Sequence, residues 1–331
     1  MGSLLTNDQQ YVVEMLQEHS ENPSGFLALN DGNLYFRDPE IDGIICYRSV
    51  GRYWIQFGGP IAGAEDRGEL FDRFRRSARR ANRRVVAVQI PSGDAGLYAE
   101  RGLRVNQLGM SYAVELADFS LRGKKFVKLR NKISRAGRLG VEPVEVGLDG
   151  HEAELGEIDR AWLRSKGRFT KEIEFMIGEV GGAAQSMRRL FLARLDGRPI
   201  AYISFSPVYG ERPGWLHDLS RRLPDSPPGV MEAINSGAIE KFRAEGVPWL
   251  HFGFTPFTGL DPEHGLPTAN PRVDRLFRLL ATKGSFLYPA QSQLEYKMKW
   301  NPNHLVPDYI AFEGRVSPSM VFSLATVANL I

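Results

Sequence analysis

The sequence predicts an α+β protein in which two consecutive halves repeat the same order of strands and helices. Three observations support this prediction. With 331 residues, the chain exceeds the roughly 100–200 residues of one ordinary domain. Its 43% hydrophobic and 24% charged residues are typical of a packed globular protein. Each half also contains strand-like segments followed by a helix-like segment, a buried strand and a second helix-like segment.

The first half begins with a segment of helical spacing and continues with two strand pairs. An Asn-Asp-Gly-Asn turn at residues 30–33 predicts a hairpin between strands at 26–29 and 34–37. The remaining elements follow from hydrophobic periodicity and from glycine at an expected helix end. They are helices at 8–19, 66–81 and 95–101 and strands at 43–50, 53–57, 85–90 and 107–116.

The second half repeats this order after a helix at 151–165. An Asp-Gly turn at residues 196–197 joins two strands, and Gly246 ends a helix whose apolar residues recur at helical spacing. The expected strands lie at 190–195, 200–208, 214–219, 249–254 and 286–288, and the further expected helices at 229–244 and 273–282.

This order of elements resembles that of an acetyltransferase-type (GNAT) fold used twice. We therefore expect an N-terminal acetyltransferase-like domain at residues 1–120 and a C-terminal, catalytic domain of the same type at residues 141–331. The segment 121–140 between them is strongly basic, and we expect it to form a linker helix. The predicted architecture is thus two tandem domains joined by a basic helical linker.

The chain contains a single cysteine, Cys46, which excludes an internal disulfide and most zinc sites. No segment approaches the roughly 20 consecutive apolar residues that cross a bilayer. The polar N-terminus also lacks the features of a signal peptide. These features favour a protein of the reducing cytoplasm. The longest apolar stretch, residues 320–331, is interrupted by three polar residues.

Positive charge is concentrated in two blocks, although the net charge is only +3. Residues 70–84 contain seven arginines and one aspartate, and residues 121–140 contain eight basic residues and no acidic one. The first block is equally well explained as a solvated helix face. The second has no acidic residue to relieve its repulsion, which favours a polyanionic partner such as nucleic acid, phospholipid headgroups or a phosphorylated cofactor.

Familiar catalytic signatures do not occur in the sequence. It contains no Walker loop, HExxH, GxSxG or metal-spaced cluster of cysteine and histidine. In acetyltransferases, a glycine-rich loop before a helix holds the pyrophosphate of coenzyme A through its backbone amides. At the two equivalent places, residues 58–66 and 221–232, prolines replace residues that would donate such N–H groups. This argues against coenzyme A as the acyl donor.

Four segments carry a more specific signal: residues 123–146, 215–233, 250–260 and 294–302. In this order they resemble the C-terminal catalytic domain of bacterial phosphatidylglycerol lysyltransferases and its soluble relatives, over roughly residues 109–312. The resemblance rests on an L-R-N-K patch, a D-L-x-R stretch followed by P-x-G-x-M-[DE], and a K-x-K-[FW]-x-P ending. The matching residues are Leu129, Arg130, Asn131, Lys132, Asp218, Leu219, Arg221, Pro227, Gly229, Met231, Glu232, Lys297, Lys299, Trp300 and Pro302.

The resemblance implies an aminoacyl-tRNA-dependent transferase. Because an aminoacyl-tRNA is already an activated ester, such an enzyme needs positioning and charge stabilisation more than a nucleophile of its own. Asp218 is expected to act as base toward the acceptor or to orient it. The expected stabilisers of negative charge on the ester oxygen are Arg221, Lys297 and Lys299. The expected substrate-binding residues are His217, His251 and Glu232, of which Glu232 would bind the α-ammonium group.

The basic segment is expected to hold the phosphates of the tRNA acceptor end, in a contact that weakens steeply with salt. Its candidate residues are Lys124, Lys125, Lys128, Arg130, Lys132 and Arg135. No metal ion and no organic cofactor are expected beyond the charged tRNA itself.

Each of these site residues also has a purely structural alternative. Asp218 and Arg221 could form a local ion pair, and Glu232 could simply favour a helix N-terminus. Lys297 and Lys299 alternate on a segment expected to be extended, where they could protect an edge strand from aggregation. Both histidines lie among apolar residues and could be core histidines with satisfied hydrogen bonds.

The leading hypothesis is transfer of the aminoacyl group to the amine, hydroxylamine or hydroxyl of a small soluble molecule, as in natural-product biosynthesis. The alternative acceptor is a lipid of the phosphatidylglycerol type, because the apolar stretch 320–331 leaves peripheral membrane contact open. An acyl-CoA N-acyltransferase would share the fold, but the pyrophosphate loop is missing. A non-catalytic RNA- or membrane-binding module would explain the basic blocks but not the spaced set of Asp218, Arg221, Glu232 and Lys297.

Overall fold

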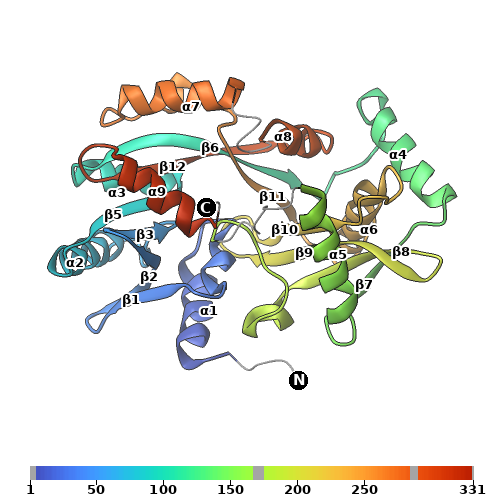
Figure 1. The fold of residues 1–331 in the computed structure, drawn as a ribbon, viewed down its shortest axis with the longest axis horizontal. Coiled ribbons are helices and arrows are strands. Elements are labelled where there is room, and N and C mark those ends of the chain that lie inside the picture. The colour runs from blue at the N-terminus through green and yellow to red at the C-terminus, as the bar shows by residue number, and fades with distance from the viewer. Residues whose placement is uncertain (1–4, 167–174, 284–289, 330–331) are drawn as a thin grey trace.

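The computed structural model describes residues 5–166, 175–283 and 290–329, in which one large sheet is covered by helices (Figure 1). Its strands follow the order β1-β2-β3-β5-β12-β6-β11-β10-β9-β8-β7, and β4 pairs with β2 outside this path. They are β1 (Leu34–Asp38), β2 (Ile41–Val50), β3 (Tyr53–Phe57), β4 (Ile61–Ala62), β5 (Arg84–Pro91), β6 (Arg104–Glu115), β7 (Glu142–Val146), β8 (Arg189–Leu195), β9 (Arg198–Val208), β10 (Gly214–Arg222), β11 (Trp249–Pro256) and β12 (His304–Phe312).

The helices begin and end at recognisable local signals. Thr6 caps the first helix in a reciprocal capping box with Gln9, and the Ser317 side chain caps the last one. The helices are α1 (Asn7–His19), α2 (Arg67–Arg80), α3 (Ser92–Glu100), α4 (Val127–Arg138), α5 (Glu152–Lys166), α6 (Val230–Ala244), α7 (Pro271–Lys283), α8 (Ala290–Met298) and α9 (Pro318–Val327). Short 3-10 segments are η1 (Gly25–Leu29), η2 (Lys124–Phe126), η3 (Ala183–Met187) and η4 (Pro262–His264).

One sheet runs through both halves of the chain. Strands β1, β2, β3, β5 and β6 of the first half form one part of it, and β7 to β11 of the second half form the other. The C-terminal strand β12 returns to the first part, where it pairs with both β5 and β6. The predicted boundaries 1–120, 121–140 and 141–331 therefore do not separate two independent sheets, and the division into two domains stays a prediction.

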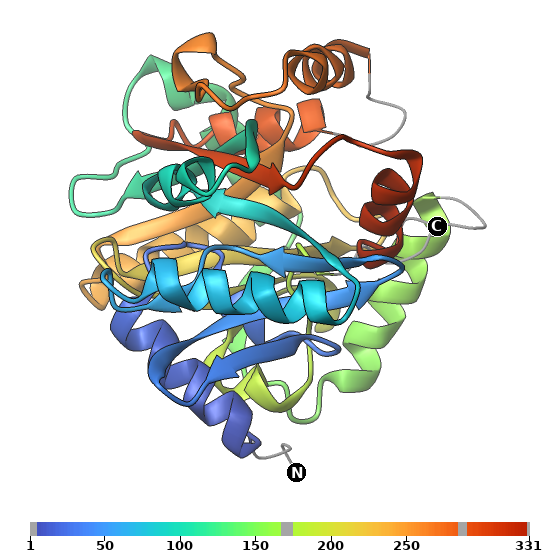
Figure 2. The same ribbon diagram turned by 90° about the vertical axis from the view of Figure 1, so that its left-hand side faces the viewer.

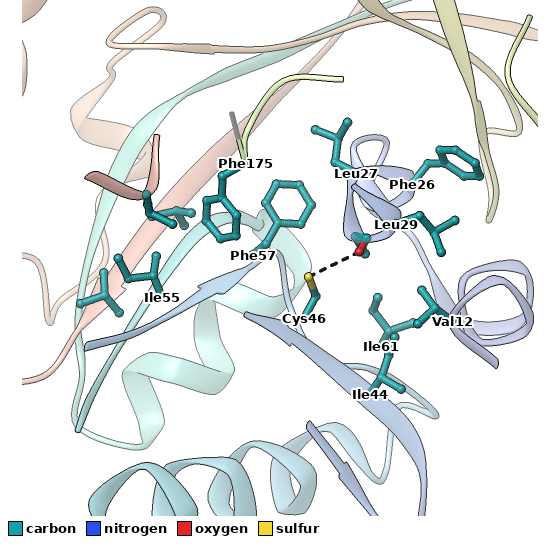
Figure 3. Close-up of a cluster of buried hydrophobic side chains, with 14 of the residues drawn as sticks. Val12, Phe26, Leu27, Leu29, Ile44, Cys46, Ile55, Phe57, Ile61 and Phe175 are labelled. Carbon is teal, nitrogen blue, oxygen red and sulfur yellow. Dashed lines mark hydrogen bonds between the residues drawn. The ribbon is translucent and has the colours of Figure 1, made fainter. Parts of the chain in front are cut away.

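In the first half, alternate side chains of each strand face two different cores. Along β2, Ile45 packs with Phe74 of α2 and Tyr98 of α3 on one face of the sheet. Ile44 and Cys46 point to the other face, into a cluster that α1, η1 and α9 cover (Figure 3). Figure 2 shows α2 in front of the sheet, on the side that faces the viewer. Both faces of this part of the sheet are therefore buried.

In the second half, α6 and α5 pack on opposite faces of the sheet. Phe205 of β9 contacts Phe242 of α6, with ring centroids 5.2 Å apart. Tyr202 of the same strand packs instead with Leu155 of α5 and Leu219 of β10. Helix α4, which contains most of the basic segment, packs on α6. The two faces are called the α6 side and the α5 side below.

The expected helices are all present within the described residues, and so are most strands. The strand expected at 26–29 is wrong, because these residues form η1. The backbone of η1 is satisfied without a partner strand: Asn33 Nδ2 donates to the carbonyls of Leu27 and Ala28 at 3.0 and 3.1 Å. Cys46 Sγ donates to the Ala28 carbonyl as well, at 3.8 Å (Figure 3).

The extended segment expected at Lys297 and Lys299 is also wrong. Lys297 lies in α8, where it is three residues after Leu294 on the inner side of the helix, and Lys299 directly follows that helix. The alternation of the two lysines therefore does not reflect a strand. Strands β4, β7 and β12 and helices α8 and α9 were not expected, and the strand expected at 286–288 lies outside the described residues. No helix in the described part of the chain is long and apolar enough to cross a membrane.

Candidate active site

The two parallel strands at the centre of the second half, β10 and β11, pair over only three residues. Residues 214–216 lie opposite residues 249–251. Directly beyond, each strand has a register shift against its other neighbour, between His217 and Leu219 of β10 and between His251 and Gly253 of β11. Such a bulge bends a strand and increases its twist. The two strands therefore diverge, and carbonyl groups of β11 become available to side chains.

Lys297 of α8 binds the carbonyl groups of β11 beyond its bulge. Its Nζ donates to Gly253 O at 2.7 Å and to Phe254 O at 2.9 Å, and lies 5.7 Å from the ring centroid of Tyr112. Gly253 adopts a φ of +69°, a conformation that favours glycine. Lys297 is only 7% exposed, and this burial lowers its pKa to about 7. A buried lysine that titrates near neutral pH is a candidate for charge stabilisation or proton transfer.

Asp308 of β12 is the acidic group that acts on the charge of Lys297. It is 4% exposed, and its Oδ2 accepts a hydrogen bond from Ser111 Oγ of β6 at 2.6 Å. Burial raises the pKa of Asp308 to about 7, although the Ser111 hydroxyl and the Lys297 charge oppose this rise. The protonation states of Asp308 and Lys297 therefore depend on each other.

His217 of β10 lies on the α6 side, between α6 and α8. Its Nδ1 is 3.2 Å from Asn235 Nδ2, and the same amide group donates to Tyr296 Oη. Burial lowers the pKa of His217 to about 3, and the positive charge of Lys297 acts in the same direction. The imidazole is therefore neutral, and because Asn235 donates to Nδ1, the ring proton is assigned to Nε2.

Glu232 lies in the first turn of α6 and is 6% exposed. Its Oε1 accepts from Lys299 Nζ at 3.0 Å and from Lys132 Nζ of α4 at 3.3 Å. Burial acts to raise the pKa of Glu232, but the bond from Lys299 and the charges of both lysines outweigh it and lower the pKa. The α-ammonium group of an aminoacyl substrate would have to compete with two lysines for this carboxylate.

The glycine of the P-x-G-x-M-[DE] motif permits this contact between α4 and α6. Gly229 has a φ of +93°, and a Cβ atom added there would lie 2.3 Å from the carbonyl oxygen of Lys132. Only glycine allows the N-terminus of α6 to approach α4 so closely. The motif residue is thus required for the packing that brings Lys132 to Glu232.

Asp218 lies on the α5 side of the sheet, although it follows His217 directly. Its Oδ2 accepts a hydrogen bond from Ser206 Oγ and lies 3.8 Å from Arg188 Nε. A backbone hydrogen bond from Gly178 also reaches the carboxylate. Burial raises the pKa of Asp218, while Arg188, Ser206 and Gly178 all act to lower it. No hydrogen bond or ion pair joins Asp218 to Lys297, whose bonds are to carbonyl groups of β11.

Arg188 connects Asp218 to the first half of the molecule. Its side chain has no exposed surface, and its Nη2 donates to Asn30 Oδ1 at 3.0 Å. The same nitrogen lies 3.7 Å from Glu179 Oε1, and the guanidinium carbon is 5.2 Å above the Phe26 ring. Arg188 was not expected, because no sequence motif marks the residues before β8. The local ion pair considered for Asp218 and Arg221 is replaced by this longer-range one.

Arg221 packs against α5. Its guanidinium carbon is 4.0 Å from the ring centroid of Trp162, and its Nε is 3.9 Å from Asp159 Oδ1. His251 matches its structural alternative, because its Nε2 lies 2.9 Å from the carbonyl oxygen of Arg212 and it is 2% exposed. Burial lowers the pKa of His251 to about 4, which makes it a neutral core histidine.

The basic segment exposes most of its candidate tRNA contacts on η2 and α4. Arg130 donates instead to the carbonyls of Leu121 and Gly123, and Lys132 pairs with Glu232. The other four candidates are exposed and form no ion pair with another described residue: Lys124, Lys125, Lys128 and Arg135. This surface therefore keeps its positive charge available to a polyanion.

The arginine run of α2 differs from this surface, because carboxylates neutralise much of it. Of the seven arginines in residues 70–84, four form ion pairs with described carboxylates. They are Arg73 with Asp38, Glu40 and Glu69, Arg76 with Glu69, and Arg75 and Arg79 with Glu313. This supports the structural explanation of the first basic block.

The expected site residues thus form two groups. The α6-side group consists of His217, Glu232, Lys297 and Lys299 together with Asn235 and Tyr296, and Asp308 of β12 acts on the charge of Lys297. The α5-side group consists of Asp218 and Arg221 together with Ser206, Arg188 and Asp159. Asn235 was missed although it is an amide on an otherwise apolar helix face, a signal that the sequence does contain. Asp308 and Arg188 carry no comparable signal.

Comparison with known proteins identifies the family to which the chain belongs. Residues 13–312 match the model of the family described as phosphatidylglycerol lysyltransferase, C-terminal. A phosphatidylglycerol lysyltransferase of Bacillus subtilis is 24% identical over 325 residues, which cover 96% of this chain and 37% of that protein. The chain thus spans little more than a third of the length of this relative.

Two solved structures share the fold. L-PGS from Bacillus licheniformis superposes with a TM-score of 0.79 at 21% identity, over 100% of this chain and 98% of that one. The C-terminal domain of a protein described as a lysylphosphatidylglycerol synthetase from Agrobacterium fabrum has a TM-score of 0.78 at 23% identity, over 96% and 95% of the two chains. At these sequence identities, the structural similarity shows that the chains share a fold. Because the family model matches nearly its whole length, the chain belongs to the phosphatidylglycerol lysyltransferase C-terminal family.

Proposed function

We propose that the chain transfers an aminoacyl group from aminoacyl-tRNA to a hydroxyl group of phosphatidylglycerol. The observation that carries this proposal is the family match over residues 13–312. The Bacillus subtilis relative is named for lysyl transfer to this lipid. Its name favours the lipid over the small soluble acceptor that the sequence analysis placed first, and it makes lysine the first amino acid to test.

We also propose that the chain contains two acetyltransferase-like units within one sheet and that the second is catalytic. Each half contains a parallel strand pair, β3 with β5 and β10 with β11. The second pair is opened by bulges next to a buried lysine. Because charged tRNA is a cytoplasmic substrate, the proposal also places the domain on the cytoplasmic side of a membrane.

In the proposed reaction, the lipid hydroxyl attacks the ester carbonyl, and negative charge develops on the carbonyl oxygen. Lys297 uses two of its three N–H groups on Gly253 and Phe254, which leaves one N–H for that oxygen. The donor is held in place before the reaction, so no reorganisation is needed as the charge develops. This role requires the protonated form of Lys297.

The attacking hydroxyl must lose a proton, and the departing ribose oxygen of the tRNA must gain one. We assign this transfer to Asp218, which would reach the ester from the α5 side through the opening between β10 and β11. Burial raises the pKa of Asp218, and Ser206 and Arg188 hold its carboxylate. Arg221 is held by α5 and Lys299 by Glu232. For these two residues we propose positioning roles.

The exposed basic surface of η2 and α4 is the proposed contact for the tRNA acceptor end. Four basic residues there lack an ion pair with described residues, as polyanion binding requires. Lys132 would link this surface to the site, since it belongs to α4 and bonds to Glu232 of the α6-side group.

The proposal is tested by incubating the purified chain with a pool of tRNAs charged with radiolabelled amino acids. Detergent-dispersed phosphatidylglycerol and a soluble metabolite extract are supplied in parallel reactions. We expect ribonuclease-sensitive transfer of labelled lysine into the organic phase. Label that moves only into the soluble extract would restore the small-molecule acceptor. Absence of transfer together with turnover of acetyl-CoA would mean that the donor was assigned wrongly.

A further inference from the structure

Helix α7 exposes apolar side chains on its outer surface. Leu276 and Leu279 are 44% and 49% exposed, and their spacing of three residues puts them on one side of the helix. The inner side of α7 is buried against the rest of the protein. Val273 is 6% exposed, and the Phe277 ring lies 5.3 Å from that of Phe257. The outer leucines are therefore additional to the residues that fix the helix to the sheet.

The same outer surface carries positive charge. Arg272, Arg275 and Arg278 are exposed, and no described carboxylate forms an ion pair with them. Asp274 forms no described ion pair with them, and its Oδ1 accepts a hydrogen bond from Asn106 Nδ2 at 2.6 Å. We define the α7 surface as Arg272, Arg275, Leu276, Arg278 and Leu279. It combines two exposed leucines with three arginines that lack an acidic partner within the described residues.

The N-terminal end of α7 is firmly attached to the centre of the sheet. Asn106 of β6 is fully buried, its Nδ2 donates to Asn270 O at 3.0 Å, and its Oδ1 accepts from Asn270 N at 3.2 Å. Asn270 Oδ1 accepts in turn from Arg272 N at 3.0 Å, as a helix-capping side chain does. The exposure of the leucines is therefore a fixed feature of the fold and not the result of loose packing.

A cavity of about 430 Å³ lies next to this surface, between α7 and residues 260–269. Leu260, Leu266 and Phe277 contribute apolar walls, and Arg278 contributes a positive charge. Asp261 and Asp274 also line the cavity, so the cavity itself does not favour an anionic headgroup, and the positive charge lies on the outer surface of α7. Figures 1 and 2 also show that α7 and α8, the helix that carries Lys297, occupy the same side of the molecule.

We propose that the α7 surface lies on a membrane that contains anionic lipids. Leu276 and Leu279 enter the boundary between headgroups and acyl chains, and the three arginines bind lipid phosphate groups. A helix with leucines beside arginines on its outer surface has the composition of interfacial membrane-binding helices. Unpaired arginines select an anionic surface over a neutral one. The inference rests on the proposed function, because it concerns how the chain reaches an acceptor that resides in a bilayer.

The test is co-flotation of the full chain with vesicles of phosphatidylcholine, with and without phosphatidylglycerol. We expect binding to the anionic vesicles that weakens as salt is added. The double variant Leu276→Ser/Leu279→Ser should lower vesicle partitioning by about tenfold or more. Replacing Arg272, Arg275 and Arg278 with glutamine should lower it by about fivefold for each arginine and flatten the salt dependence.

A matched control replaces two exposed apolar residues on the edge strands β1 and β7. Leu34→Ser/Val144→Ser changes side chains that are 47% and 36% exposed, and it should leave vesicle binding unchanged. Thermal unfolding of each variant shows that it remains folded. The proposal is overturned if the α7 variants bind like the control, or if neutral and anionic vesicles bind equally. It is also overturned if the α7 leucines instead support dimers of the chain and no vesicle binding occurs.

A second readout separates this inference from the proposed function. Transfer from charged tRNA is measured with a water-soluble, short-chain phosphatidylglycerol and with vesicles. The α7 leucine variant should match the unchanged chain on the soluble acceptor and lose rate only on vesicles. Loss of rate on both acceptors would contradict a role limited to the membrane. Vesicle binding through α7 without transfer to any acceptor would contradict the proposed function and leave the membrane surface supported.

Discussion

The two halves of the molecule contain the same parallel strand pair but use it differently. In the first half, β3 and β5 pair over five residues, and Gly58 N donates to Val88 O at 2.8 Å just beyond them. In the second half, β10 and β11 pair over three residues before a bulge on each strand separates them. Strand β5 also shifts register, against β12, just beyond its pairing with β3. The halves therefore differ in that only one strand of the first pair bulges, whereas both strands of the second pair do and the paired stretch is shorter.

The side chains at the two strand pairs also differ, because those at the first pair are mostly apolar and those at the second include ionisable groups. The pair of β3 and β5 is called the closed pair below. Ile55 and Phe57 line it, and the one buried amide of β3, Gln56, donates to Tyr98 Oη at 2.7 Å. The pair of β10 and β11 is called the open pair below. Next to it lie Lys297 and His217, ionisable groups whose pKa values burial lowers. Because such groups cluster at functional sites, the chemistry is expected in the second half.

The largest effect is expected from removing Lys297. Lys297→Ala should lower the single-turnover rate of transfer from charged tRNA by about 10²–10³, because the oxyanion loses a fixed donor. The matched change in the closed pair, Gln56→Ala, should lower the free energy of unfolding by about 1–3 kcal/mol and leave the rate per folded molecule unchanged. Comparable loss of rate in both folded variants would break the distinction between the halves.

Asp218 provides the second prediction, because it is bound to the first half through Arg188. Asp218→Asn should abolish turnover and leave the Arg188 guanidinium without its buried carboxylate, a loss of about 3–5 kcal/mol of stability. The double variant Asp218→Asn/Arg188→Met should recover part of the stability but none of the turnover. Denaturant unfolding measures the first effect and transfer assays the second. Normal turnover in Asp218→Asn would remove it from the site.

Local patterns predicted most elements because apolar strand segments and the helical spacing of apolar residues are both clear in this chain. Residues 85–90 and 229–244 are found by apolar runs and by helical spacing, and the structure has a strand and a helix there. The strand predicted at residues 26–29 is wrong, because the prediction combined a turn signal with a short apolar run. What decides this segment is Asn33, whose side chain occupies the carbonyls that a partner strand would need. That contact is not visible in a sequence pattern.

The motifs identified several residues of the candidate site but not their partners. Asp218, Glu232 and Lys297 lie in recognisable segments, whereas Arg188 and Asp308 do not. Asp308 reaches Ser111, 197 residues earlier, because β12 lies between β5 and β6. A sheet order of this kind depends on tertiary packing and not on local spacing. For the same reason, the sequence could not show that the site residues lie on two sides of the sheet.

The third prediction concerns pH and sharpens the description of the open pair. Since Lys297 acts in its protonated form and its pKa is about 7, the transfer rate should fall as pH rises through about 7. Asp308 raises the pKa of Lys297, so Asp308→Asn should move this fall to lower pH, by roughly one unit. Lys297→Arg, which keeps its charge, should move it to much higher pH. A pH profile that neither variant changes would contradict this role of Lys297.

The smallest effect is expected from the two basic surfaces, which extend the comparison to the outside of the molecule. Lys128→Gln/Arg135→Gln removes exposed charges without an ion pair, so it should weaken tRNA binding and reduce the slope of log affinity against log salt by about 0.7–0.9 per lost contact. Arg76→Gln/Arg79→Gln removes as much charge from α2, where carboxylates already neutralise both residues. Affinity and slope should then remain the same. If both double variants weakened binding equally, the total charge of the chain and not its placement beside the open pair would govern tRNA binding, and α4 would lose its assigned role.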